Sequence, residues 1–277
     1  WLPDNKVNDI LPIDSSTVWI ATSYGISQIK QVKMTLEQKA DSIGNITERR
    51  HNRLGLMNHS KLKIPGDLNS SRMENEDNDG LWTSCYLAAQ CFRYGATKSP
   101  DARDIAVRTF DALERLETVT GISGYPARSY ALSTDSVKQS RSPHPKFWRS
   151  SPDGKWQWLD DTSADEIVGH IFSITLFHDL VADQNQKDRA INLMDRMVTH
   201  IVDNNFQMID FDGKPTRWGI WNPDSLNHSK NWMFERGLNS LQILSHLKTA
   251  IHFTGKEKFE KAYNELIETH GYAKNAV

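Results

Sequence analysis

Residues 156–180 of this chain, WQWLDDTSADEIVGHIFSITLFHDL, decide how the rest of the sequence is interpreted. The segment opens with tryptophans at alternate positions and a pair of aspartates, and then becomes strongly apolar. Ser163 followed by Glu166 is typical of a capping box, so a helix is expected to begin here. This helix is apolar on nearly every side, which indicates that other elements surround it. Its polar residues and short length argue against a membrane span.

The composition narrows the class of protein. The chain has 277 residues, which is enough for a substantial core. Its formal net charge is −2 and it has no long basic run, which argues against a nucleic-acid partner. Cys85 and Cys91 lie on one expected helix and face different sides, so no disulfide between them is expected. The chain has no signal peptide and begins with Trp1, so we expect a processed or excised fragment of a protein that continues before Trp1 and beyond Val277.

Helical periodicity continues on both sides of the opening segment. A capping box of Thr35 and Gln38 predicts a first helix that ends near residue 50. Six further helices are expected in three hairpins, because short connections join the members of each pair. Long segments connect the pairs, namely 118–160 and 205–229, and another long loop precedes residue 80. Antiparallel alternation brings these long segments to one end, which is the expected working face.

The first 30 residues have a different pattern. Three β-rich runs are separated by turn residues, and they cover Val7–Ile13, Val18–Thr22 and Ile26–Ile29. The pattern resembles the blade repeat of two-component-regulator-type β-propellers. The alternative is a small β-meander that leads into the main domain. The predicted fold class is therefore an all-α main domain with a short N-terminal β-meander.

The helical hairpins, with acid- and tryptophan-rich loops, resemble the (α/α)6 toroids, or six-hairpin proteins, of glycoside hydrolases, polysaccharide lyases and sugar epimerases. The segments DNDGLWT, TGISGYPARSY, DDTSADEIVGH and DGKPTRWGIWNP resemble an uncharacterised bacterial branch that carries propeller repeats. The resemblance implies a partial toroid ring over 33–277, a propeller-like fragment over 1–32, and a periplasmic or extracellular location. It also implies a glycan or oligosaccharide ligand.

Carboxylates near the expected helix starts are the candidates for acid and base catalysis. Crowded like charges raise one pKa, which suits a general acid. Asp161 is the residue least explained by helix capping, and Asp79 is its expected partner across a sugar. The alternative is structural, because aspartates also cap helices and complement the helix dipole. The complete set of catalytic candidates is Asp161, Asp79, Asp165 and Glu166.

Aromatic and arginine side chains on the same segments are the candidates for binding substrate. Tryptophan rings stack on the apolar faces of sugars, and an arginine can clamp the carboxylate of a uronic acid. The alternative for each is anchoring of a loop or burial in the core. The substrate-binding candidates are Trp82, Tyr125, Arg128, Trp158, Trp218, Trp221 and Arg236.

Other chemistries have no support in the sequence. The histidines lack metal-ligand spacing, so no metal and no cofactor are expected. Neither GxSxG, a P-loop nor a dinucleotide fingerprint occurs. The predicted function is that of a carbohydrate-active enzyme, a glycoside hydrolase or polysaccharide lyase. The alternatives are a non-catalytic glycan-binding or sensor module and a purely structural scaffold. The sugar, the linkage and the oligomeric state do not follow from the sequence.

Overall fold

The structure of the protein is a computed structural model that describes residues 2–137 and 147–277. The chain divides into two compact units. Unit 1 comprises the residues up to 53 together with 57–74, and unit 2 comprises 54–56 and 75–277. The division into domains at residue 32 stays a prediction, because compactness is not the same as independent folding.

The protein is of mixed α and β class, with about 51% helix and 19% strand in several small antiparallel sheets. The prediction of an all-α main domain that forms a partial (α/α) toroid is therefore wrong. Many of the strands lie in long connections that the sequence interpretation treated as loops. A long connection packed against helices must pair its backbone N–H and C=O groups, and local antiparallel pairing does this.

Unit 1 begins with a three-stranded antiparallel meander. Its strands β1 (Val7–Pro12), β2 (Thr17–Thr22) and β3 (Gly25–Lys30) lie where the sequence predicts them. Helix α1 (Leu36–His51) follows, and it has the predicted capping box of Thr35 and Gln38. The remaining short elements in this part of the chain are β4 (Asn52–Arg53), β5 (Leu56–Met57), β6 (His59–Leu62), the 3-10 turn η1 (Leu68–Ser70) and β7 (Ser71–Glu74).

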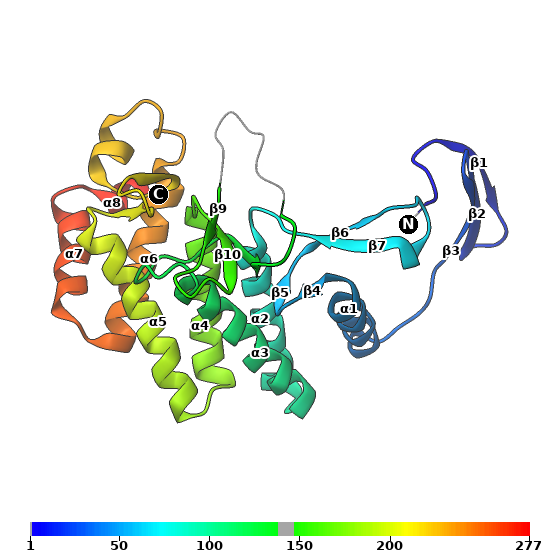
Figure 1. Ribbon diagram of the computed structural model, residues 1–277, viewed down its shortest axis with the longest axis horizontal. Helices are drawn as coiled ribbons and strands as arrows, with labels where there is room; N and C mark the ends of the chain where they lie inside the picture. Colours follow the sequence, from blue (N-terminus) through cyan, green and yellow to red (C-terminus); the bar gives the residue numbers. More distant parts are fainter. Residues whose placement is uncertain (1, 138–146) are drawn as a thin grey trace. The chain divides into compact units, whose positions relative to one another are not determined.

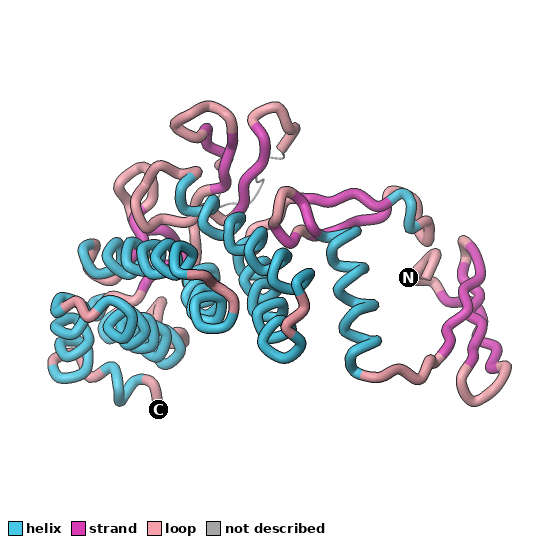
Figure 2. Tube along the Cα trace, turned by 90° about the horizontal axis from the view of Figure 1, so that it is seen from below, coloured by secondary structure: helices cyan, strands magenta, loops and turns pink. Residues whose placement is uncertain are grey.

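Unit 2 is built on three helical hairpins, as the short connections predict (Figure 1). Helix α4 lies in the middle, where it packs against both α2 and α6. Figure 2 shows these helices packed side by side. The hairpins are α2 (Asp79–Thr97) with α3 (Pro100–Thr118), α4 (Ala164–Leu180) with α5 (Gln184–Asp203), and α6 (Arg236–Thr254) with α7 (Glu257–Glu268), followed by the short α8 (Tyr272–Asn275).

The long connections of unit 2 contain two small antiparallel sheets. In the first, β10 (Trp156–Leu159) lies between β8 (Ser129–Leu132) and β9 (Trp148–Ser150). In the second, β11 (Gln207–Ile209) pairs with β12 (Pro215–Ile220), and the turn between them contains Asp212 and Gly213. A π-helical segment, η2 (Asp224–His228), then leads toward α6.

Helix α4 contributes several side chains to the core of unit 2. Phe177 of α4 stacks on Phe110 of α3 with ring centroids 4.3 Å apart. Glycines let α2 and α4 approach closely, because a Cβ on Gly80 would lie 2.1 Å from a carboxylate oxygen of Glu166. Phe172 is 52% exposed, so the expectation that α4 is covered on every side is wrong for this side chain. None of the helices in the described ranges is long and apolar enough to cross a membrane.

The start of α4 differs from the prediction. The Ser163 hydroxyl donates to Asp165 and not to a helix N–H group, and Glu166 does not reach back to cap the helix. Glu166 instead lies fully buried against α2. The predicted capping box is therefore wrong, because burial of Glu166 between two helices takes its side chain away from the helix end.

Gly124 is a position where a side chain would not fit. Its φ is +77°, and a Cβ there would lie 2.1 Å from the carbonyl oxygen of Arg196 on α5. We predict that Gly124→Ala lowers the free energy of unfolding by about 3 kcal/mol or more, because backbone strain and overpacking add. Urea denaturation followed by circular dichroism measures this loss.

The matched control is Gly154→Ala. Gly154 also has a positive φ, +69°, but nothing lies within 4 Å of the Cβ that alanine would add. Only the backbone term applies there, so the expected loss is about 1 kcal/mol. Equal losses in the two variants would show that Gly124 does not pack closely against α5.

His246 of α6 gives a prediction for the dependence of stability on pH. It is buried beside Trp221, and neither ring nitrogen has a hydrogen-bond partner among the described residues. Burial lowers the pKa of His246 to about 4. An unfolded histidine has a pKa of about 6.5. The unfolded state therefore binds a proton first, and stability is lost as the pH falls from about 6.5 to about 4.

We predict that His246→Leu makes this loss shallower by about 1.4 kcal/mol per pH unit within that window. Denaturant unfolding at a series of pH values gives the slope. His252→Leu changes an exposed histidine on the same helix and serves as the control. A slope that is the same for His246→Leu and the unchanged protein would contradict the burial of a neutral ring.

Candidate functional site

A cavity of about 410 Å³ opens in unit 2 where helices α2, α4 and α6 begin. Its volume lies within the usual range of small-molecule sites. The three long segments expected at the working face each contribute to its walls, which agrees with the alternation of short and long connections. The lining residues are Asp77, Asn78, Arg128, Ser163, Ala164, Asp165, Trp218, Trp232, Glu235, Leu238, Asn239 and Gln242.

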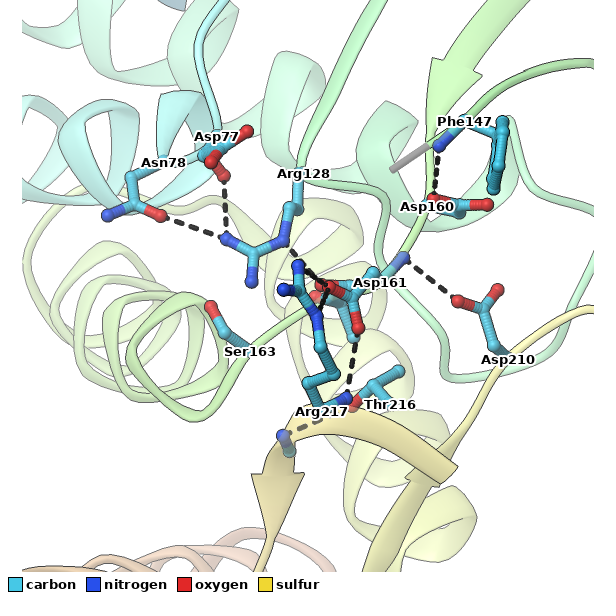
Figure 3. Close-up of polar contacts among 12 residues, drawn as sticks. Asp77, Asn78, Arg128, Phe147, Asp160, Asp161, Ser163, Asp210, Thr216 and Arg217 are labelled. Carbon is cyan, nitrogen blue, oxygen red and sulfur yellow. Dashed lines mark hydrogen bonds and ion pairs between the residues drawn. The ribbon is translucent and has the colours of Figure 1, made fainter. Parts of the chain in front are cut away.

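Arg128 connects the segments that form one wall of this pocket. Its side chain is only 3% exposed. The Nη1 group donates to the carbonyl oxygen of Asp77 and to Oδ1 of Asn78, both at 3.0 Å, and the Nε group donates to the carbonyl oxygen of Asp161 (Figure 3). Hydrogen bonds that involve a charged donor are stronger than neutral ones. Arg128 therefore ties the start of α2 to the loop that enters α4.

Asp161 is a second anchor, and its geometry does not fit the predicted catalytic role. Its φ is +60°, a conformation that aspartate tolerates better than most residues. Its N–H donates to Asp210 at 2.9 Å. Its carboxylate accepts the backbone N–H of Arg217 at 2.9 Å and two side-chain bonds from Arg217 at 2.8 and 2.5 Å (Figure 3). Asp161 thus binds β12 and does not line the pocket.

The neighbouring Asp160 has a similar structural role. It accepts the N–H of Phe147 at 2.7 Å and forms an ion pair with Arg149 at 2.9 Å. Burial raises the pKa of Asp160, although these hydrogen bonds act in the opposite direction. The side chain holds β9 against the end of β10.

Asp79 and Glu166 are buried and do not line the pocket. Asp79 is fully buried and accepts the hydroxyl of Ser129 at 2.5 Å. Burial raises the pKa of Glu166 well above its ordinary value, with the Arg128 charge acting against this. Glu166 is therefore favoured in its neutral form. Neither residue has the access to ligand that the predicted catalytic roles need.

The carboxylates that do line the pocket come from three segments. Asp165 lies in the first turn of α4 and accepts a hydrogen bond from Ser163. Glu235 immediately precedes α6, and its side chain does not cap that helix. Asp77 precedes α2 and is exposed. Of the predicted catalytic residues, only Asp165 has direct access to the cavity.

Two tryptophans give the pocket an aromatic wall. Trp218 of β12 is 45% exposed, and its ring packs edge to face with Trp232 at a centroid distance of 6.0 Å. A parallel bridge pairs Trp218 with Ser163 at the start of α4. Trp218 was predicted from its loop, and Trp232 was not. The spacing of these residues contains no signal for their contact, which depends on how the loop folds back.

Most other predicted binding residues are part of the core. Tyr125, Trp158 and Trp221 are almost fully buried, and the Tyr125 hydroxyl accepts the N–H of Thr162 at 3.1 Å. Burial raises the pKa of Tyr125. Trp82 is exposed on α2 outside the pocket, and Arg236 does not line it. Of the predicted binding residues, Arg128 and Trp218 lie at the cavity.

The pocket therefore combines aromatic faces, carboxylates, amides and one guanidinium. Within the described ranges, no three or more His, Cys, Asp or Glu side chains are grouped so that they could hold a metal ion. The pocket residues that the sequence-based candidate set lacked are mostly on α6 and on the segment that leads into it: Trp232, Glu235, Leu238, Asn239 and Gln242. A polar residue at a helix start was a usable signal for Glu235.

Asp161 can be tested as an anchor. We predict that Asp161→Asn lowers the free energy of unfolding by about 1–2 kcal/mol, because the charged hydrogen bonds to the partly exposed Arg217 are weakened. Thermal and urea denaturation measure the loss. In a double-mutant cycle with Arg217→Gln, the two effects should not add. Asp212→Asn, in the β11–β12 turn, should change stability by less than about 0.5 kcal/mol. Additive effects would contradict the anchor role.

Comparison with known proteins gives the site no precedent. No protein family, no curated protein and no solved structure matches this chain. The chemistry of the pocket is therefore inferred from its own side chains.

Proposed function

We propose that unit 2 is a carbohydrate-active enzyme that binds a glycan in this pocket and cleaves a glycosidic bond by acid and base chemistry. One observation carries the proposal: two tryptophan rings and three carboxylates line the same cavity. Aromatic rings beside carboxylates suit a sugar, which has apolar ring faces and polar edges.

The aromatic wall supplies the binding surface. Trp218 and Trp232 present ring surface to the cavity, on which a sugar ring can stack. Asn239 and Gln242 supply polar contacts, and each is held in place by its other amide atom. The Asn239 amide donates to the carbonyl of Ile220 at 3.0 Å, and the Gln242 oxygen accepts from Trp221 at 3.0 Å. Side chains that are already ordered lose less entropy when ligand binds.

The carboxylates supply the chemistry. Glycosidases use a pair of carboxyl groups, one as acid and one as base or nucleophile. Asp165 lines the cavity and accepts a hydrogen bond from the Ser163 hydroxyl, which orients its carboxylate, so we assign it as base or nucleophile. Glu235 is assigned as the acid that protonates the leaving oxygen. Asp77, which is more exposed, is assigned to binding.

The proposal is tested by turnover on a panel of polysaccharides with the full chain. We predict that Asp165→Asn and Glu235→Gln each lower kcat by about 10²–10⁴-fold, since each removes a proton-transfer group. Reducing-end release and ultraviolet absorbance of unsaturated products together detect both hydrolysis and elimination. Glu260→Gln, which alters an exposed acid on α7, should leave kcat unchanged.

The alternative is a non-catalytic glycan-binding module, which would give a different result on the same panel. In that case glycans bind, Trp218→Ala weakens the binding, and no member of the panel is cleaved. Binding without turnover would overturn the enzymatic proposal and leave the binding role. Absence of both would overturn the glycan assignment.

A further inference from the structure

The guanidinium of Arg128 has few donors left for a ligand. Its Nε–H is donated to the carbonyl of Asp161, and Nη1 donates to Asp77 and Asn78. Since Nη1 carries only two N–H groups, both are in use. Figure 3 shows the remaining nitrogen, Nη2, without a contact among the residues drawn, and no hydrogen bond to it occurs within the described part of the chain. Arg128 nonetheless lines the pocket.

This arrangement prevents a bidentate clamp on a carboxylate. Such a clamp uses two parallel N–H groups on one edge of the guanidinium. One edge joins Nε to Nη2, and the other joins Nη1 to Nη2. On each edge, one of the two nitrogens already donates its N–H groups to other parts of the protein. Arg128 can therefore offer a ligand only the single nitrogen Nη2, which suits a hydroxyl oxygen.

The charge of the pocket also disfavours a ligand that carries a carboxylate. The side chains of three acidic residues, Asp77, Asp165 and Glu235, line the cavity with this one guanidinium. A uronic acid would bring a further carboxylate close to those that are ionised. Like charges at short range repel, and the repulsion is stronger away from bulk water. An uncharged sugar carries no such penalty.

We infer that the pocket selects uncharged sugar residues and rejects uronic acids. A ring hydroxyl accepts from Nη2 of Arg128 while an apolar face of the sugar lies on Trp218 or Trp232. This inference rests on the proposed function and deepens it, because β-elimination by a polysaccharide lyase requires a uronate. The reaction is then hydrolysis of a neutral glycan.

Hydrolysis of the glycosidic bond needs water as its only co-reactant. The bond between the anomeric carbon and the leaving oxygen breaks, and Glu235 gives its proton to that oxygen. In an inverting reaction water supplies its oxygen to the anomeric carbon and one proton to Asp165, and a proton transfer from Asp165 to Glu235 through solvent restores the starting state. In a retaining reaction Asp165 first bonds to the anomeric carbon, and water then displaces it while giving one proton to Glu235, which restores both carboxyl groups.

Matched sugars test the selection. The probes are methyl glycosides of glucose, galactose and mannose, each paired with the glycoside of its uronic acid, which differs only in the oxidation of carbon 6. Binding to the full chain is measured by calorimetry or ligand-observed NMR. At least one neutral probe is expected to bind ten-fold or more tightly than its uronate. Added salt should narrow this gap, because it screens the repulsion.

A variant with one fewer charge provides the internal check. Asp165→Asn removes one carboxylate from the cavity wall. It should raise the ratio of uronate affinity to neutral-sugar affinity several-fold. Uronates that bind as tightly as, or more tightly than, their neutral partners would overturn the selection while leaving the glycan proposal intact. Absence of binding by every probe would overturn both the selection and the glycan proposal.

Discussion

A buried guanidinium, that of Arg128, connects the segments at the end of unit 2 where the cavity lies. Arg128 is on the segment after α3, yet its donors bind the residues before α2 and the loop that enters α4. A charged group that is almost fully buried is costly unless hydrogen bonds satisfy it. Each of the backbone carbonyls it reaches must therefore stay in place. The position of the loops follows from the need to satisfy one side chain.

Asp161 extends this constraint to the next segment. Its carbonyl accepts from Arg128, while its carboxylate binds Arg217 on β12 and its N–H binds Asp210. The two anchors thus link segments that are far apart in the sequence. The segments linked in this way adjoin the groups that face the cavity, namely Asp165, Glu235 and the tryptophans. Sites of this kind depend on residues that touch no ligand.

Burial separates the acidic residues into two groups. Asp79, Asp160, Asp161 and Glu166 are all buried and serve structure through hydrogen bonds, ion pairs or a favoured neutral form. Asp77, Asp165 and Glu235 face the cavity and keep access to a ligand. Crowding of acids in the sequence therefore pointed to the segments around the cavity, but it did not distinguish the buried anchors from the side chains that line the cavity. Only the direction of each side chain does that.

The sequence by itself determined the helical hairpins, the N-terminal strands, the capping box before α1 and the end at which the long segments gather. These features depend on local periodicity, on turn residues and on connection length, which are visible along the chain. The tertiary structure alone decided that long connections pair into sheets, that Glu166 turns inward, and that Trp232 and Glu235 meet Asp165 at one cavity. Those outcomes depend on contacts between residues distant in sequence, where burial and hydrogen-bond satisfaction outweigh local preference.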